Sequence, residues 1–259
     1  NFKDLVRSDK WNPFCKLYDL EMSRCTIGKN VIFRTGTIDK TLEKYASDED
    51  FKNNGYLEYR GKAFPNAETL NVYFDFERDF LDAQIDNEIS QLVNMFIQVK
   101  STKEPVWERG AQTLLHGIIL AMLDDASNPE SGFTREMMTL KTIKDYFYRI
   151  KQRALAEKGT TINDIKCLKD KPMKVKNVLS NVIETAYVTM QGYLSTFESS
   201  ISDWFQAHVF ALTTNNTITY EKLNDDNPFA IFVVTRDYEK SDFRVAGLFI
   251  DWVYSQMIK

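Results

Sequence analysis

The sequence contains little cysteine, histidine, glycine or proline. Its 259 residues include three cysteines, two histidines, ten glycines and six prolines. Cys15, Cys25 and Cys167 form no CxxC pair, and no histidine stands at a zinc-ligand spacing, so we expect neither a disulfide framework nor structural zinc. A reducing, cytosolic compartment agrees with this usage. The longest apolar run, GIILAML, is far shorter than the roughly 20 residues of a membrane span.

The familiar catalytic motifs are also missing. A phosphate-binding loop reads GxxxxGK[ST], and the nearest stretch, SRCTIGKN, has Ser23 in place of the first glycine and Asn30 in place of the hydroxyl residue. No GxSxG, HExxH or Cys/His dyad occurs. His116 and His208 lie in apolar stretches with no carboxylate three or four residues further on, which favours structural roles. We therefore assign no catalytic residue and no metal ligand.

Hydrophobic side chains recur at helical spacing through the middle of the chain, so we expect helices to dominate residues 77–212. In a stretch ending at Phe96, and in another beginning after Pro105, they recur every three or four residues. Ser200 and Asp203 resemble a capping box that opens the last helix of this region.

The two ends of the chain read as α/β. YLEYRGKAF alternates like a strand on either side of a glycine, which predicts a hairpin or a small addition to a sheet. FAIFVV, Phe229 to Val234, is an uninterrupted apolar run typical of a strand buried on both faces. We expect a helix over about 242–257 to cover it. The triplet Thr235, Arg236 and Asp237 then follows the carboxyl end of the strand, where open α/β sheets collect their ligands. These three residues are candidates for facing a nucleotide or a channel, and turn chemistry is the alternative explanation of the polar triplet.

A basic segment stands out in a chain of net charge -4. Between Lys141 and Lys176 there are eleven Lys or Arg residues and four Asp or Glu residues. Such a segment can attract nucleic acid, or it can be the solvated face of a helix. If it binds nucleic acid, we expect weak, electrostatic contacts through five basic candidates. Tyr146, Phe147 and Tyr148 offer stacking groups, but on a helix at least one of the three faces the core. The five candidates are Lys141, Lys144, Arg149, Lys151 and Arg153.

Four blocks in order carry a resemblance to a known family. They are SDKWNPF, VWERGAQTLLHGIILAML, VTMQGYLSTFESSISDWF and NPFAIFVVTRDYEKSDFRVAGLFIDWVYSQ. With these blocks the chain resembles the TraG/VirD4 family of type IV secretion coupling proteins, the ATPases of bacterial conjugation. The similarity spans residues 1–14 and about 80–259, and the block from Cys15 to about Leu70 resembles a lineage-specific elaboration.

The resemblance implies a domain plan. In that family an all-α domain interrupts a RecA-like nucleotide-binding domain. Residues 1–76 would then be a partial nucleotide-binding domain with an α+β elaboration, residues 77–215 the all-α domain, and residues 216–259 a returning strand and helix. The expected fold class is mainly α, with partial α/β elements on both sides. Because the chain starts at Asn1 and stops within an amphipathic pattern, we expect a piece of a longer protein.

The resemblance also implies partners. The full-length protein would be a membrane-anchored homo-hexamer at the cytoplasmic face of the bacterial membrane that uses ATP and Mg²⁺ to drive DNA transfer. This chain, without the ATPase motifs, would need no cofactor of its own. Its partners would be relaxase and relaxosome proteins, secretion-channel components and, as an open alternative, single-stranded DNA. The competing hypothesis is a docking module that binds proteins without contacting DNA.

Overall fold

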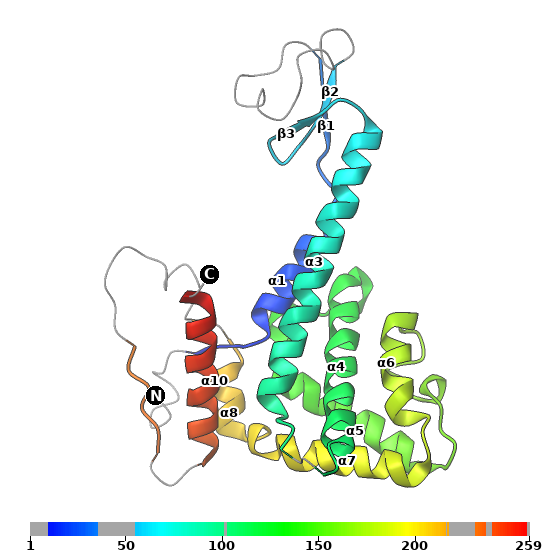
Figure 1. Ribbon diagram of the computed structural model, residues 1–259, viewed down its shortest axis with the longest axis vertical. Coiled ribbons are helices and arrows are strands. Elements are labelled where there is room, and N and C mark those ends of the chain that lie inside the picture. The colour runs from blue at the N-terminus through cyan, green and yellow to red at the C-terminus, as the bar shows by residue number, and fades with distance from the viewer. Residues whose placement is uncertain are drawn as a thin grey trace. The chain divides into compact units, whose positions relative to one another are not determined.

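The computed structural model describes residues 10–35, 55–100, 103–215, 217, 231–236 and 240–257. These residues are mainly helical, with one small sheet (Figure 1). The mainly α class is thus confirmed, whereas the RecA-like character of the flanking parts stays a prediction. The chain divides into two compact units, one of residues 1–18 and 88–259 and the other of residues 19–87. The expected assignment of residues 1–76, 77–215 and 216–259 to family domains also stays a prediction.

The first unit, which we call the helical unit, is a bundle. It contains the start of α1 (Cys15–Cys25) and the end of α3 (Ala67–Phe96). Its remaining helices are α4 (Val106–Ser127), α5 (Leu140–Ala156), α6 (Met173–Ile183), α7 (Tyr187–Ile201), α8 (Ala207–Thr213) and α10 (Lys240–Met257). Short 3-10 turns lie between them: η2 (Pro129–Ser131), η3 (Arg135–Met137), η4 (Ile162–Asp164) and η5 (Ser202–Trp204).

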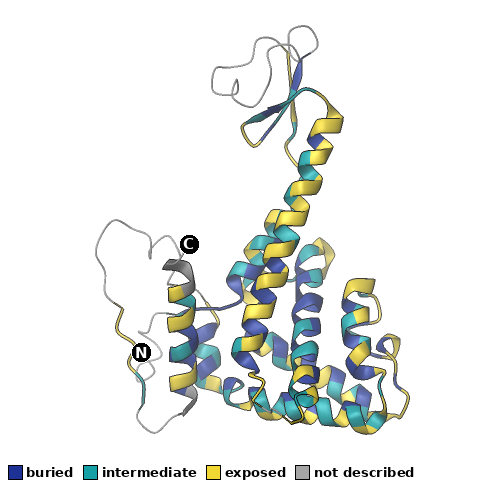
Figure 2. Ribbon diagram, in the orientation of Figure 1, coloured by how far each residue is buried: buried dark blue, intermediate teal, exposed yellow. Residues whose placement is uncertain are grey.

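Helix α4 is the centre of this unit. The expected stripe is buried, since Ala111, Leu114 and Ile118 are fully enclosed, and the opposite side is buried as well, including Ile119 and Ala121 (Figure 2). Every residue from Gly117 to Leu123 is buried, and a helical stretch that is apolar all round belongs inside a bundle, whereas the first turns of α4 keep a polar side on which Arg109 is exposed. Accordingly, α4 packs most extensively against α6 and α7 and also meets α5.

Glycines let the helices of the unit approach closely. A Cβ atom on Gly117 of α4 would lie 2.4 Å from a methyl carbon of Leu179 on α6. Likewise, a Cβ atom on Gly192 of α7 would lie 2.4 Å from the Trp107 ring. Both distances are far below van der Waals contact, so the glycines are required by packing between helices rather than by backbone conformation.

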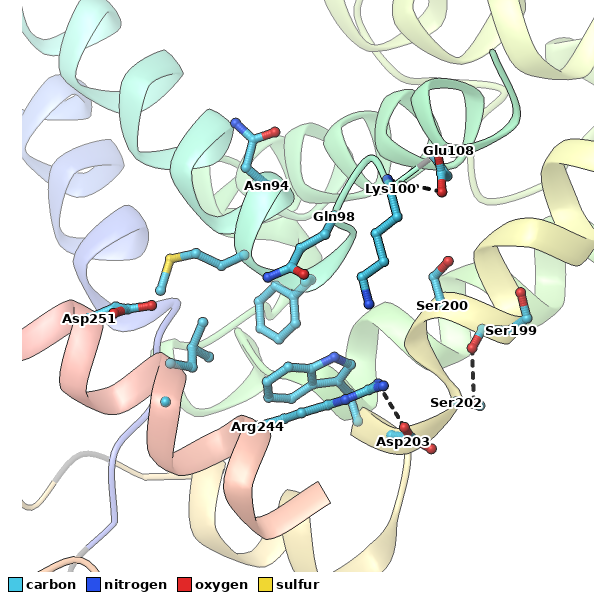
Figure 3. Close-up of a pocket in the computed structure, with 15 residues that line it drawn as sticks. Asn94, Gln98, Lys100, Glu108, Ser199, Ser200, Ser202, Asp203, Arg244 and Asp251 are labelled. Carbon is cyan, nitrogen blue, oxygen red and sulfur yellow. Dashed lines mark hydrogen bonds and ion pairs between the residues drawn. The ribbon is translucent and has the colours of Figure 1, made fainter. Parts of the chain in front are cut away.

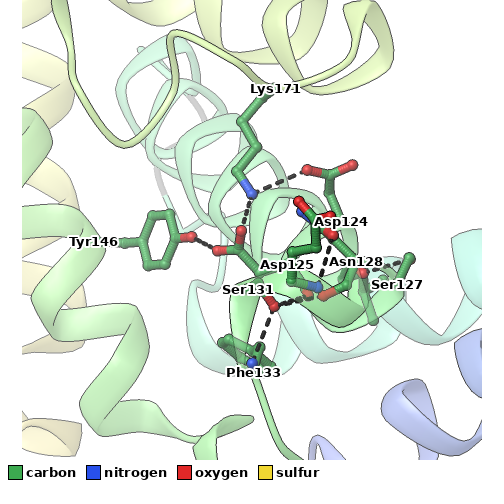
Figure 4. Close-up of polar contacts among 10 residues, drawn as sticks. Asp124, Asp125, Ser127, Asn128, Ser131, Phe133, Tyr146 and Lys171 are labelled. Carbon is green, nitrogen blue, oxygen red and sulfur yellow. Dashed lines mark hydrogen bonds and ion pairs between the residues drawn. The ribbon is translucent and has the colours of Figure 1, made fainter.

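A polar cluster ties the end of α4 to the loop before α6 (Figure 4). The Lys171 amine forms ion pairs with Asp124, at 3.0 Å, and with Asp125, while its side chain is only 8% exposed. The Tyr146 hydroxyl of α5 donates a hydrogen bond to Asp125. Burial, followed by the neighbouring Asp125 carboxylate, raises the pKa of Tyr146 well above its ordinary value, so the phenol stays a hydrogen-bond donor.

The second unit, which we call the hairpin unit, contains the sheet. Strands β1 (Ile32–Arg34), β2 (Tyr56–Tyr59) and β3 (Lys62–Phe64) pair antiparallel in that order. Arg60 and Gly61 connect β2 to β3 with φ angles of 49° and 72°, as a two-residue hairpin turn requires. The hairpin predicted from YLEYRGKAF is confirmed. The first turns of α3 pack on it through Tyr59, whose ring centroid lies 4.9 Å from that of Phe74.

Two local predictions are wrong. Ser200 does not cap a helix, because α7 continues through it to Ile201 and η5 follows directly. FAIFVV is not a buried strand over its described part, since Ile231–Val234 has no regular structure and Phe232 is 83% exposed. A strand buried on both faces needs hydrogen-bonded neighbours, and the described residues form no sheet except β1-β2-β3.

The predicted C-terminal helix is present as α10, but it covers a different partner. Ala246 and Phe249 are buried as expected, whereas Ile250 is 51% exposed. The ring of Phe249 lies 5.5 Å from Trp11 in an edge-to-face arrangement, so α10 packs on the N-terminal segment. Helix α10 also contacts α8 and η5.

Candidate functional site

A pocket of about 660 Å³ lies in the helical unit where four helices meet (Figure 3). Its walls come from the end of α3, the segment that follows it, the first turn of α4, the end of α7 with η5, and α10. Phe96 and Trp204 contribute apolar wall, and their rings meet edge to face with centroids 4.8 Å apart. This aromatic pair holds α3 and η5 together beside the polar groups of the pocket.

The polar lining of this pocket carries groups of both charges, since the carboxylates of Glu108, Asp203 and Asp251 lie beside the cations of Lys100 and Arg244. Arg244 of α10 forms a 2.7 Å ion pair with Asp203, and Lys100 extends its amine into the same space (Figure 3). Ser199 and Ser200 line the α7 side. With both charges and several hydroxyl and amide groups in its wall, the pocket suits the binding of a polar group on a partner.

The second polar site joins segments that are distant in sequence. Arg236 binds the Asp242 carboxylate through two side-chain hydrogen bonds, of 2.8 and 2.7 Å, and through its backbone amide at 3.1 Å. His208 Nε2 of α8 lies 3.3 Å from the same carboxylate. The Asp242 side chain is fully buried. The apolar run before it points to Arg236, whereas no sequence pattern links Arg236 to Asp242, six residues further on, or to His208 on α8.

The other members of the predicted triplet are not brought into this cluster. Thr235 is half-buried in the same irregular segment, and Asp237 lies outside the described residues. The Arg236 side chain is thus bound to Asp242 within the chain. It is also one of the three residues predicted to contact a nucleotide or a channel. Whether the triplet faces either of these stays a prediction.

The charge of Asp242 is stabilised by its surroundings. Burial acts to raise the pKa of this carboxyl, but the Arg236 side chain and amide, together with His208, act in the opposite direction, and the net pKa lies below the ordinary value of 3.8. A depressed folded-state pKa stabilises the fold fully above the unfolded value. That stabilisation is lost as pH falls below 3.8 and through the folded-state value.

Asp242→Asn is expected to lower the free energy of unfolding at neutral pH by about 2 kcal/mol, because it leaves the Arg236 guanidinium without its charged partner. The difference from the unchanged protein should shrink as the pH falls below 3.8 and should be lost below the lower folded-state pKa, where Asp242 is neutral in the folded protein too. Urea unfolding followed by circular dichroism at neutral and acidic pH measures both effects. A difference that is independent of pH would contradict the role of the carboxylate charge.

The five basic candidates all lie on α5, but they do not form one open patch. Lys141 and Arg149 are exposed. Lys151 pairs with Glu198 of α7 at 2.6 Å, and Arg153 pairs with Glu157 at 3.3 Å. Lys144 lies between aromatic rings of its own helix and of the α8 region, 5.6 Å from the centroid of Phe210. Three of the five are thus already engaged by groups of the chain.

The three aromatic residues predicted as stacking groups are not all accessible either. Tyr146 and Phe147 are buried, and only Tyr148, at 43% exposed, is available on the surface of α5. The sequence allowed for at least one of the three to face the core, and the structure buries two. His116, for which the sequence favours a structural role, is half-buried on α4.

Among the residues that the structure describes, no three His, Cys, Asp or Glu side chains are grouped so that they could hold a metal ion. Within the same residues, no helix has both the length and the apolar content needed to cross a membrane.

Comparisons of the chain with protein-family models, with curated proteins and with solved structures give no match. The resemblance to the TraG/VirD4 family therefore rests on the four sequence blocks alone.

Proposed function

We propose that the chain is the helical, substrate-docking part of a bacterial conjugation coupling protein of the TraG/VirD4 type. The observation that carries the proposal is the order of the four sequence blocks, from SDKWNPF to the stretch that ends in WVYSQ. The helical bundle between Val106 and Thr213 is compatible with it, since the family plan expects an all-α domain in this region. In the full-length protein, ATP and Mg²⁺ would drive DNA transfer by a membrane-anchored hexamer, while this part would bring relaxase or relaxosome proteins to the secretion channel.

Within this proposal, contact with protein is favoured over contact with DNA. Nonspecific binding of nucleic acid depends on cations that can neutralise phosphates. In the basic segment, Lys171 is buried against Asp124 and Asp125, and Lys151 and Arg153 are paired with glutamates, so fewer cations are open than the sequence count suggests. Lys141, Arg149 and Lys169 are among those that stay exposed. The pocket lined by Lys100 and Arg244 adds a recessed polar site suited to a side chain of a protein partner.

A mating experiment tests the coupling function. In donor cells that carry the complete gene, an in-frame deletion of the codons for residues 106–213 should reduce transfer of the conjugative DNA to recipients by several orders of magnitude. Relaxase nicking at the transfer origin should continue, because a coupling protein acts after the DNA has been processed. Transfer at the normal frequency would refute the proposal, provided that the shortened protein is the only copy in the cell.

A second allele separates the two modes of docking. Lys141, Lys144, Arg149, Lys151 and Arg153 are replaced together by glutamine, and the purified chain is titrated against labelled single-stranded DNA by fluorescence anisotropy at low and moderate salt. If the unit docks proteins, the replacement should leave both the DNA affinity and the transfer frequency unchanged. A steep loss of DNA affinity accompanied by a loss of transfer would instead establish α5 as a DNA contact.

A further inference from the structure

Helix α3 carries a row of exposed apolar side chains in the hairpin unit. Val72, Phe76 and Phe80 follow one another at intervals of four residues and are 66%, 68% and 54% exposed. Residues four apart lie on one face of a helix, so the three side chains form a continuous line, which we call the α3 stripe. Single exposed hydrophobic residues are ordinary, but a contiguous apolar patch on a surface marks an interaction site.

The stripe borders a groove next to the hairpin. Val72 and Phe76, together with Phe64 and Pro65 from the end of β3, line a recess of about 520 Å³. Tyr73 closes one side of the recess, with its ring centroid 5.1 Å from that of Phe64. The stripe thus offers a depression that can receive a side chain, beside a row of exposed apolar groups.

Acidic residues repeat along the same face. Asp75 and Asp79 each follow a member of the stripe by three residues, and Asp86 follows Asp79 by seven, which is about two helical turns. All three aspartates are exposed. Asp75 pairs at 2.8 Å with Arg78, which is the one basic residue of α3. Apolar side chains and carboxylates therefore run in parallel rows along one side of α3.

We propose that the α3 stripe binds a basic amphipathic helix of a partner protein. Aliphatic side chains of such a helix, spaced three and four residues apart, would pack between Val72, Phe76 and Phe80 and enter the recess, as in other helix-in-groove complexes. Its lysines or arginines would meet the row of aspartates. The proposal rests on the hairpin unit and does not depend on the coupling function proposed above.

The row of aspartates favours a basic helix over a second copy of the chain, an anionic membrane or a nucleic acid. A second copy of the chain would bring one row of aspartates against another, and like charges across an interface oppose association. An anionic membrane surface or a nucleic acid would be repelled by the same row. Two basic groups beside the stripe are engaged within the chain, since Lys62 donates to the Tyr73 hydroxyl at 3.0 Å and Arg78 pairs with Asp75. A partner of positive charge gains from both the apolar and the acidic side of the face.

The test uses the full chain and a synthetic helical peptide of about 18 residues, a length sufficient for helix formation, with leucines at a spacing of three and four and lysines elsewhere. Calorimetry should show saturable binding that weakens as salt is added. The double variant Phe76→Ser, Phe80→Ser should bind at least tenfold more weakly. The matched control is Val188→Ser, which removes a single exposed apolar side chain from α7, 75% exposed, and should leave the affinity unchanged.

The contribution of the aspartates is tested with a second variant and a second peptide. Asp79→Asn with Asp86→Asn, which leaves the pair of Asp75 and Arg78 in place, should weaken binding of the lysine peptide and reduce its dependence on salt. The same peptide with glutamate in place of lysine should not bind. Absence of binding by the lysine peptide, or equal affinity of the serine variant and the control, would overturn the proposal. Self-association of the chain that disappears in the serine variant would assign the stripe to a second copy and would overturn it as well.

Discussion

Replacing Lys171 by alanine is expected to lower the free energy of unfolding by about 2–3 kcal/mol. The Lys171 side chain is nearly enclosed and holds Asp124 and Asp125 together at the end of α4 (Figure 4). Without the ammonium group, two adjacent carboxylates repel each other, and the loop before α6 loses its attachment. Removing one partner of a buried ion pair costs more than the pair itself contributes, because the remaining charge stays partly desolvated. Urea unfolding followed by circular dichroism measures the change.

Lys169→Ala provides the control for this prediction. Lys169 lies in the same loop but is exposed, so its removal should change the free energy of unfolding by less than about 0.5 kcal/mol. A further variant that combines Lys171→Met with Asp124→Asn and Asp125→Asn removes the whole charge cluster and should recover part of the lost stability. Equal stabilities of Lys171→Ala and Lys169→Ala would show that the cluster is not stabilising.

Gly117→Val is expected to destabilise the helical unit by about 2–3 kcal/mol through overpacking. The added Cβ would stand 2.4 Å from Leu179, and Leu179 is fully buried. Extra atoms in a close-packed interior force side chains out of their rotamers or helices apart. Valine is also a better helix former than glycine, so any loss of stability is attributable to the clash.

The glycine on α10 serves as the comparison. A Cβ atom on Gly247 would meet nothing within 4 Å, so Gly247→Ala should leave stability unchanged or raise it by up to about 1 kcal/mol. Thermal unfolding of the two variants measures the contrast. If Gly117→Val melted as high as the unchanged protein, α4 and α6 would have to separate at little cost, and the close approach would not be important for stability.

The elements that could be predicted are those with strong local patterns. The hairpin at Arg60 and Gly61 follows from a two-residue turn between alternating segments. Helices α4 and α5 follow from apolar residues at helical spacing, which persists over several turns. In both cases the information lies within a single stretch of sequence.

The predictions that failed depended on contacts between stretches. FAIFVV has the composition of a buried strand, but a strand is defined by its neighbours, and the described residues provide none for Ile231–Val234. Ser200 and Asp203 have the spacing of a capping box, yet α7 continues through the serine because its apolar face extends to Ile201. Local spacing alone cannot distinguish the interior of a helix from its start.

The candidate site shows the same limit. Arg236 was found from its position after an apolar run, whereas Asp242 was read only as the start of a helix and His208 only as a structural residue. Their contact joins α8 to α10 and cannot be read from spacing. The pocket lined by Lys100 and Arg244 is likewise assembled from four helices, and no single segment carries a signature of it.

The ion pair between Lys16 and Glu88 closes the helical unit at the place where the chain leaves it and returns. The chain leaves this unit after Tyr18 and returns at Glu88, and the ion pair joins residues that flank the exit and the return. The stacked rings of Phe14 and Phe96, with centroids 5.6 Å apart, join the same two stretches. Domains whose ends meet in this way accept inserted sequence between them. Residues 19–87 leave and rejoin the helical unit within two helices, α1 and α3, so another binding module could replace them only if it continued both helices.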